Sequence, residues 1–182
     1  KKYLKLLIKI CKKNNILIAF DEMQAGFART GQSFGYKHYG VRPDLICCGK
    51  GMGGGIALSG VIGRKKIMDL PEVGNMSSTN SANPIACSAG LAVLEEIKTK
   101  KLIKNTKKKG KILFSELRRI KELYPNIIKE VNGEGLIAAI IFRETKEKKI
   151  NLILKKLVEK CMSEGLLLVY TGRESIKIGP PL

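Results

Sequence analysis

Two oppositely charged residues, Asp21 and Lys50, each lie at the end of an apolar run. Asp21 follows the run ILIAF at 16–20, and Lys50 closes the run DLICCGK at 44–50. Continuous apolar runs of this length are typical of strands buried on both faces of a parallel sheet. Because ligands of open α/β sheets bind outside the carboxyl ends of the strands, we expect Asp21 and Lys50 to face a shared ligand at one edge.

Taken alone, each residue has a simpler interpretation: Asp21 as a turn or helix cap, and Lys50 as an ordinary surface lysine. The glycine-rich run GKGMGGG at 49–55 favours a ligand, because glycines let the backbone approach one closely. The run is not a Walker phosphate loop, since Gly51 follows Lys50 and the order G-x-x-x-x-G-K-[ST] is not met.

A longer pattern surrounds these two residues. The segment FDEMQAGFARTGQSFGYKHYGVRPDLICCGKGMGGG at 20–55 resembles the signature of the class III, pyridoxal-phosphate-dependent aminotransferases. The segments STNSANPIACSAGLAVLE at 78–95 and KIGPPL at 177–182 are similar to later motifs of that family, in the same order. Lys50 lies 29 positions after Asp21 and 29 positions before Thr79. A match of this length and spacing is very specific.

The resemblance implies an α/β protein of fold type I of the pyridoxal-phosphate enzymes. Residues 1–100 would be the C-terminal half of the cofactor-binding large domain, built on a mostly parallel sheet. Residues 101–182 would be an incomplete, smaller α+β C-terminal domain. Both ends of the chain look cut, so we expect a longer protein with an earlier Gly-Ser/Thr loop for the phosphate and an aromatic residue stacked on the ring. The isolated residues 1–182 would then expose strand edges and be unstable.

The resemblance also implies roles for individual residues in binding pyridoxal 5′-phosphate. Lys50 would form the Schiff base with the cofactor aldehyde and later move the substrate proton. Asp21 would pair with the pyridine nitrogen and keep it protonated. Gln24 would hydrogen-bond the phenolic oxygen, and Met23 would pack on one face of the ring, although a plain core methionine is nearly as good an interpretation. Thr79 would donate its hydroxyl to the cofactor phosphate across a subunit interface, which implies a homodimer.

Other residues of the motif receive supporting roles. Glu22, Arg29 and Thr30 lie in a polar, glycine-rich segment and are interpreted as groups that order the loop. His38, the single histidine, is interpreted as a packing or surface residue. Asn83, followed by Pro84, is expected to begin a helix rather than to touch a ligand.

The match departs from the family at Lys177, where an arginine usually holds the substrate carboxylate. Lysine keeps the charge but lacks the bidentate guanidinium fork, so a carboxylate would be held with less geometric precision. Alternatively, the substrate lacks a carboxylate at that position or is held differently. Substrate identity therefore stays open, with Lys177 as a candidate substrate-binding residue.

The resemblance implies an enzyme that moves an amino group between an amine or amino acid and a 2-oxo acid. Alternatives on the same scaffold are an aminomutase, a racemase, a decarboxylase and a lyase, because the cofactor supplies the electron sink in all of them. A truncated, inactive remnant is a further alternative.

Composition limits the partners. The net charge is +18, but the lysines share their segments with apolar residues at helical spacing, which is typical of solvated helix faces. Aromatic residues are 5% and no recognition motif is present, so we expect no nucleic-acid partner. Neither a membrane-spanning run nor a signal peptide is found, and the five cysteines form no CxxC pair. We expect buried, reduced thiols in a cytoplasmic protein, and no metal site.

These residues must be positioned by alternating strands and helices. Residues 22–43 and 70–83 read as loops, and a domain boundary is expected near residue 100. Strands are predicted at 16–20, 44–50, 57–63, 135–142, 166–170 and 175–179, and helices at 3–13, from Pro84 to 97, 102–123 and 150–164.

Overall fold

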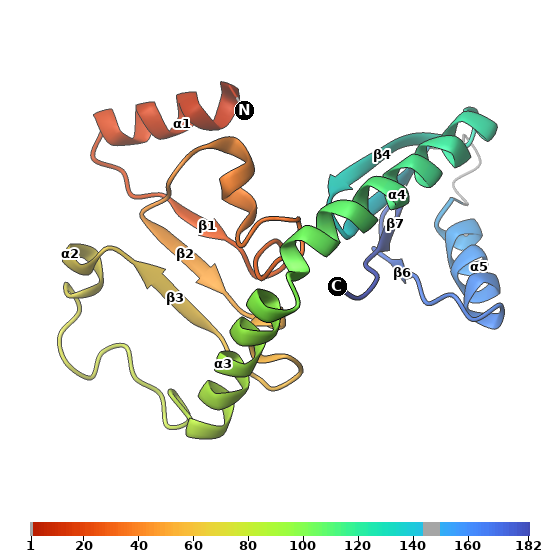
Figure 1. Ribbon diagram of the computed structural model, residues 1–182. Helices are drawn as coiled ribbons and strands as arrows, with labels where there is room; N and C mark the ends of the chain where they lie inside the picture. Colours follow the sequence, from red (N-terminus) through yellow and green to blue (C-terminus); the bar gives the residue numbers. More distant parts are fainter. Residues whose placement is uncertain (1, 144–149) are drawn as a thin grey trace. The chain divides into compact units, whose positions relative to one another are not determined.

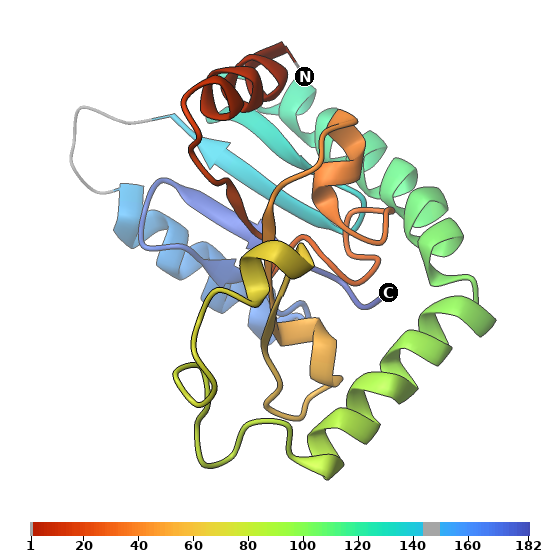
Figure 2. The ribbon, with the colours of Figure 1, turned by 90° about the vertical axis from the view of Figure 1, so that its left-hand side faces the viewer.

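The computed structural model describes residues 2–143 and 150–182, and the chain divides into two units, Lys1–Ile103 and Lys104–Leu182 (Figures 1 and 2). Each unit contains one sheet with helices beside it. The assignment of the two units to a large and a small domain stays a prediction.

The sheet of the first unit has the strand order β1-β2-β3. Strand β1 (Ala19–Asp21) runs parallel to β2 (Leu45–Cys48), which pairs antiparallel with β3 (Gly60–Gly63). The last residue of β1, Asp21, lies opposite Cys47 of β2. The pairing extends one residue further, since the Glu22 backbone N–H donates to the Cys47 carbonyl at 2.9 Å. The two parallel strands therefore end at the same edge of the sheet.

All three strands of this sheet are shorter and less buried than predicted. Ile16 and Leu17 are exposed by 54% each and precede β1, and Val61 and Ile62 of β3 are exposed by 44% and 49%. In β1 itself Ala19 and Asp21 are exposed, so the expectation of burial on both faces is wrong here. Lys50 lies beyond β2, in a short 3-10 helix, η2 (Lys50–Gly53).

Helix α1 (Lys2–Lys13) precedes β1 and confirms the predicted helix. Ile8 is buried, and the other predicted inward residues, Leu4, Leu7 and Cys11, are half-buried. The helix ends at Lys13, and Asn15, two residues further on, has a φ of 55° in the left-handed region. The next residue, Ile16, donates its N–H to the Cys11 carbonyl at 2.8 Å, which closes a Schellman cap.

Helix α3 (Pro84–Thr99) begins as the sequence predicts. The Asn83 side chain accepts hydrogen bonds from the N–H groups of Ile85 and Ala86 at 2.9 and 3.4 Å, and Pro84 occupies the first helical position. Both features are standard helix-start chemistry. The predicted loop 22–43 also holds a 3-10 helix η1 (Gly35–Tyr39), and a single turn α2 (Lys65–Met68) lies just before the predicted loop 70–83.

The second unit holds a four-stranded antiparallel sheet with the order β4-β5-β7-β6. Helices α4 (Leu102–Leu123) and α5 (Ile150–Ser163) agree with the predicted helices to within one residue, and Gly165, with a φ of 83°, follows α5 as a cap. The core of the unit joins both helices to the sheet through Ile120, Leu154, Phe142 and Ile176. The strands are β4 (Ile128–Glu134), β5 (Ile137–Phe142), β6 (Val169–Tyr170) and β7 (Ser175–Ile178).

Strand β4 was not predicted from the sequence. Its residues are mostly exposed, charged or polar, and only Ile128 is buried. The strand forms because it pairs with β5 at the edge of the sheet, where a polar outer surface is normal. Its pairing partner, rather than its own hydrophobic pattern, makes it a strand.

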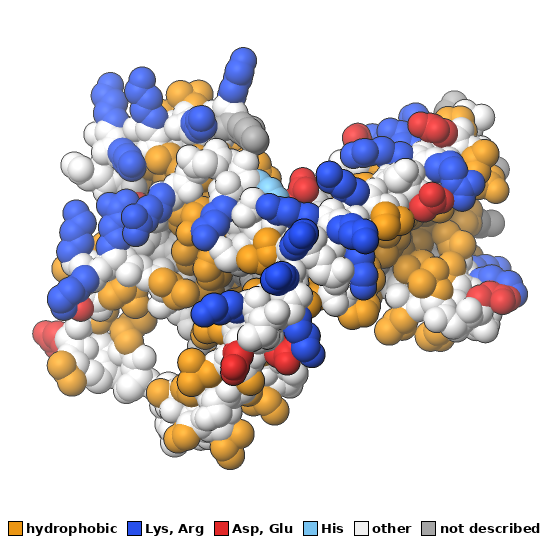
Figure 3. All heavy atoms as spheres, in the orientation of Figure 1, with side chains coloured by type: hydrophobic (Ala, Val, Ile, Leu, Met, Phe, Trp, Pro, Cys, Tyr) orange, Lys and Arg blue, Asp and Glu red, His pale blue; other side chains and the backbone are white. Residues whose placement is uncertain are grey.

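The basic side chains lie on the surface of both units. All five lysines of α1 and the lysines at 104–111 of α4 are exposed, and Figure 3 shows blue side chains over both helices. This placement agrees with the prediction of solvated helix faces. Among the described residues, no helix is both long and apolar enough to cross a membrane, and no group of His, Cys, Asp and Glu side chains could hold a metal ion.

The described cysteines are all free, but the expectation that they are buried holds only in part. Cys48 is buried, Cys87 is exposed, and Cys11, Cys47 and Cys161 are half-buried. Cys87 lies in the first turns of α3, where Ala86 and Gly90 are the buried residues.

We predict that Leu154→Ala lowers the free energy of unfolding of the second unit by about 2–5 kcal/mol, because Leu154 is 0% exposed at the centre of the core and its removal leaves a cavity. Urea denaturation monitored by circular dichroism measures the change. Leu152→Ala on the same helix is the matched control, since Leu152 is 51% exposed and should change stability by less than about 0.5 kcal/mol. Equal losses for both variants would contradict the assigned core.

Candidate active site

The edge where β1 and β2 end holds an acid and an amine. Asp21 is the last residue of β1, and Lys50 follows the last residue of β2 by two positions. Because the two strands are parallel neighbours, both residues lie at the carboxyl edge of the sheet. Both side chains are exposed, so they are open to a ligand.

The Asp21 carboxylate is oriented by its own loop. Its Oδ1 accepts a hydrogen bond from the Met23 backbone N–H at 2.9 Å. This Asx-type turn occurs where an aspartate ends one element and begins a loop. It turns the chain so that Met23 and Gln24 follow directly beside the carboxylate.

Lys50 is held in an unusual backbone conformation near Gln24. Its φ is 48°, in the left-handed region that a side chain disfavours. Such residues persist only where the surroundings determine the conformation, and they cluster at functional sites. The Lys50 Nζ donates a long hydrogen bond of 3.5 Å to the Gln24 Oε1. The Lys50 amine, which follows β2, thus contacts the Gln24 amide, which follows β1.

Glu22 is a buried carboxylate that organises the loop after β1. It is 2% exposed, and its two oxygens accept hydrogen bonds from the backbone N–H groups of Gly35 at 2.8 Å and Tyr36 at 2.7 Å. Hydrogen bonds to an ionised acceptor are short and strong. They fasten the far end of the loop to the start of the motif. The prediction that Glu22 orders the loop is confirmed.

The other predicted loop-ordering residues also face inward. Thr30 is 7% exposed and its Oγ1 donates to the Ala25 carbonyl at 3.4 Å. The His38 Nε2 lies 3.0 Å from the Thr30 carbonyl, which agrees with a packing role. Burial lowers the pKa of Arg29, which is half-buried in the same loop.

Cys48 lies just before the glycine-rich turn and behaves as a core thiol. Burial raises the pKa of Cys48, and the negative charges of Glu22 and Cys47 raise it further. A raised pKa keeps the thiol protonated at neutral pH, and only the thiolate is a strong nucleophile. Cys48 therefore does not compete with Lys50 as a nucleophile.

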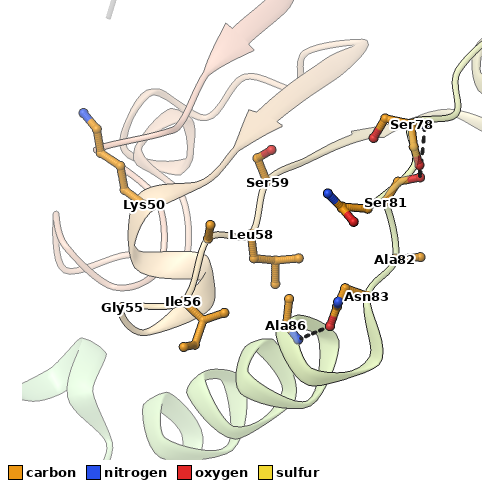
Figure 4. A pocket seen from close by; sticks show the side chains of 12 residues that line it. Lys50, Gly55, Ile56, Leu58, Ser59, Ser78, Ser81, Ala82, Asn83 and Ala86 are labelled. Carbon is orange, nitrogen blue, oxygen red and sulfur yellow. Dashed lines mark hydrogen bonds between the residues drawn. The ribbon is translucent and has the colours of Figure 1, made fainter.

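A cavity of about 630 Å³ lies on the other side of the glycine-rich turn. Its walls are Lys50, the stretch Gly55–Ser59, the loop before α3 and the first turn of that helix. Figure 4 shows Ser59, Ser81 and Asn83 around this space, while the Lys50 side chain extends away from them. Sequence reasoning did not single out Ser59 or Ser81, and it assigned Asn83 to the start of a helix. The signal for the two serines was their position, Ser59 after the glycines and Ser81 two residues after Thr79.

Thr79 lies at the tip of a turn in the loop before α3. The Ser81 N–H donates to the Ser78 carbonyl at 3.0 Å, so Thr79 and Asn80 form the corner of a β-turn. Thr79 is exposed there, and among the described residues no hydrogen bond joins it to Lys50 or Gln24. Contacts thus link Asp21, Met23 and Gln24 to Lys50, while Ser78 and Asn80, on either side of Thr79, line the cavity that Lys50 also lines.

Lys177 belongs to the second unit. It lies in β7, opposite Ala139 of β5 and Val169 of β6, and is half-buried. Its predicted contact with substrate is not tested by this position.

The residues at the edge fit pyridoxal 5′-phosphate by their chemistry. They offer an exposed carboxylate for a ring nitrogen, a primary amine for an aldehyde and an amide for a phenolic oxygen. The buried Gly49 lets backbone and side chains approach closely beside Lys50. Asp21, Gln24 and Lys50 are the residues that would hold the cofactor.

The chain belongs to a family of transferases: residues 1–182 match the family described as Aminotransferase class-III. The cofactor of this family is pyridoxal 5′-phosphate, and the resemblance inferred from the motifs is confirmed.

Two curated proteins of the family are similar in sequence to this chain. The chain is 41% identical over 180 residues to the acetylornithine aminotransferase of Synechocystis sp., which covers 99% of this chain and 41% of the relative. It is 40% identical over 184 residues to the leucine/methionine racemase of Thermococcus litoralis, covering 99% of this chain and 41% of that one. The chain therefore spans less than half the length of these curated relatives.

Solved structures of aminotransferases have a fold similar to that of this chain. The acetylornithine aminotransferase from Elizabethkingia anophelis superposes with a TM-score of 0.88 at 33% identity, over 98% of this chain and 44% of that chain. The ornithine aminotransferase from Toxoplasma gondii gives a TM-score of 0.89 at 30% identity, over 98% and 42% of the two chains. The α/β fold is thus fold type I of the pyridoxal-phosphate enzymes, as predicted.

We predict that Glu22→Gln lowers the free energy of unfolding by about 2 kcal/mol, because the amide has one oxygen acceptor, so one of the two backbone N–H groups loses its partner and the other loses a charged one. The same change lowers the pKa of Cys48, since the negative charge of Glu22 raises it. The pH dependence of Cys48 alkylation, read by mass spectrometry, should therefore move to lower pH.

The matched control is Glu95→Gln, because Glu95 is exposed on α3 of the same unit and should change neither quantity. A Cys48 profile that stays in place or moves to higher pH would refute the electrostatic contact with Glu22.

Proposed function

We propose that the protein containing this chain is a pyridoxal-phosphate-dependent aminotransferase that moves an amino group between an amine or amino acid and a 2-oxo acid. One observation carries the proposal: parallel neighbours β1 and β2 deliver the Asp21 carboxylate and the Lys50 amine to one sheet edge, with Gln24 Oε1 3.5 Å from the Lys50 Nζ. The family match supports the same reading.

When bound, pyridoxal 5′-phosphate supplies an aldehyde carbon and an electron-accepting ring. Lys50 supplies the primary amine that binds the aldehyde, and its Nζ then moves the proton of the reacting substrate carbon as base and acid. The Gln24 amide lies within reach of that Nζ and keeps it directed toward the sheet edge.

Asp21 holds a proton on the ring nitrogen. Its carboxylate is negative and exposed at the edge, and the Met23 N–H fixes the orientation of Oδ1. An opposite charge beside a protonated nitrogen favours the protonated form. Gln24 would also donate to the phenolic oxygen, and Met23 would cover one face of the ring.

Thr79 would bind the cofactor phosphate of a second subunit, so we propose a homodimer. An exposed β-turn tip is suited to reach a neighbouring chain, and Thr79 has no hydrogen bond to Lys50 or Gln24 within the part of the chain that the structure describes. We place the protein in the cytoplasm, since its described cysteines are all free.

The amino donor we propose is an amino acid of the acetylornithine or ornithine type. Its support is the set of similar proteins, in which acetylornithine aminotransferases recur. Lys177 would hold a substrate carboxylate by charge.

A second candidate, racemisation of an amino acid, is favoured by the 40% identity to the leucine/methionine racemase. A half-reaction separates the two. Incubated with the amino donor alone, the protein expressed at its full encoded length should release one equivalent of oxo product per site and keep the amino group, then pass it to an added 2-oxo acid. Inversion of the donor without any oxo product would establish the racemase instead.

We predict that Lys50→Ala abolishes the near-visible absorbance band of the bound cofactor and lowers kcat by at least about 10³-fold, because the variant lacks the nucleophilic and proton-carrying amine. Absorbance spectra and steady-state rates of the full-length protein measure both. Lys65→Ala is the control, since that exposed lysine pairs only with Asp69 on a surface turn. An unchanged band in Lys50→Ala would remove Lys50 from its role.

We predict that Lys177→Arg lowers KM severalfold for an amino donor with a carboxylate, because a guanidinium binds carboxylates in a bidentate manner. Lys177→Ala should raise the same KM. The comparison substrate is the corresponding amine without the carboxylate, whose KM should not respond. Parallel changes for both donors would mean that Lys177 does not contact the carboxylate.

A further inference from the structure

Met23 connects the acid and the amine of the candidate site. Its backbone N–H donates to the Asp21 Oδ1 at 2.9 Å, and its half-buried side chain reaches across to the residue before Lys50. The thioether Sδ lies against Gly49. Gln24, the next residue in the chain, meets the Lys50 Nζ at 3.5 Å.

A side chain at residue 49 would meet this contact, while the backbone itself does not call for glycine. Its φ of 177° and ψ of −154° are extended, so the φ does not call for glycine. A Cβ at residue 49 would overlap the Met23 Sδ, while its next neighbours, the Met23 Cε at 3.4 Å and the Ser59 Cβ at 3.5 Å, lie at ordinary contact distances. The Met23 thioether is therefore the group that an added Cβ would have to displace.

The contact between Met23 and Gly49 affects Lys50, the next residue in the chain. Its φ of 48° is disfavoured for a residue with a side chain, so neighbouring contacts must hold it. Met23 packs on the preceding residue and Gln24 hydrogen-bonds the amine. The two consecutive residues thus contact Lys50 from its backbone side and from its side-chain end.

We propose that Met23 is a positioning residue, which acts through Gly49 to set the place of the Lys50 amine relative to the Asp21 carboxylate. This inference rests on the proposed function of Lys50 and goes beyond a contact of Met23 with the cofactor ring. The thioether carries no exchangeable proton, so its effect is geometric. Small displacements of a reacting group can lower a rate about 100-fold.

A double-mutant cycle tests the proposal, with Gly49→Ala, Met23→Ala and the double variant in the full-length protein. The first readout needs no cofactor: the rate of acylation of the Lys50 Nζ in the apoprotein, relative to the other lysines, by competitive labelling and mass spectrometry. The second readout is kcat. The matched control is Gly60→Ala in β3. Its added Cβ would lie 3.8 Å from the Met52 Cε, an ordinary contact distance.

In the native background, Gly49→Ala should lower kcat about tenfold and raise the relative labelling rate of Lys50 about threefold, because the amine loses the Gln24 contact. In the Met23→Ala background the same substitution should change each quantity less than about twofold, since the overlap is gone. Gly60→Ala should have no effect in either background.

Equal factors for Gly49→Ala in both backgrounds would overturn the proposal. If Gly49→Ala does not fold, folding of the double variant supports the proposal and its failure overturns it, because another group would then exclude the Cβ. Coupling in the labelling data of a protein without transaminase activity would refute the proposed function and leave the positioning role standing. Transaminase activity together with equal effects of Gly49→Ala in both backgrounds would refute the positioning role and leave the proposed function standing.

Discussion

The parallel pairing of β1 with β2 is the interaction on which the candidate site depends. It brings residues 29 positions apart, Asp21 and Lys50, to the same edge of one sheet. Parallel strands have the same direction, so whatever follows them emerges on the same side. A shift of the register opposite Cys47 would move the acid away from the amine and change which side chains face the loop.

Polar groups around this edge have divided roles because their surroundings differ. Asp21 and Glu22 are consecutive carboxylates, yet one is exposed and the other is 2% exposed. The exposed one keeps its charge available to a ligand. The buried one is satisfied by two backbone N–H groups, as a buried ionised group must be. Burial raises the pKa of the neighbouring Cys48 thiol, and the same inward charge raises it further.

Much of the helical structure could be predicted, and less of the sheets. Asn83 with Pro84 and Gly165 are local signals, since the groups that cap a helix lie within a few residues of its end. The predicted strands were too long because Ile16 and Leu17 are apolar but lie outside the pairing with β2. Strand β4 was missed because its exposed, polar residues form a strand only beside β5.

By itself, the sequence determined the family, the identity of the acid and amine pair, and the helix ends, because these depend on residue types at fixed short spacings or on a long ordered motif. Only the tertiary structure decided that Glu22 holds the N–H groups of Gly35 and Tyr36, and that the Met23 thioether lies against Gly49. Those contacts join distant segments whose separation is set by strand pairing and loop path. The residues next to Glu22 or Met23 in the chain do not specify which distant segment each side chain contacts, so these contacts are set only when the strands pair.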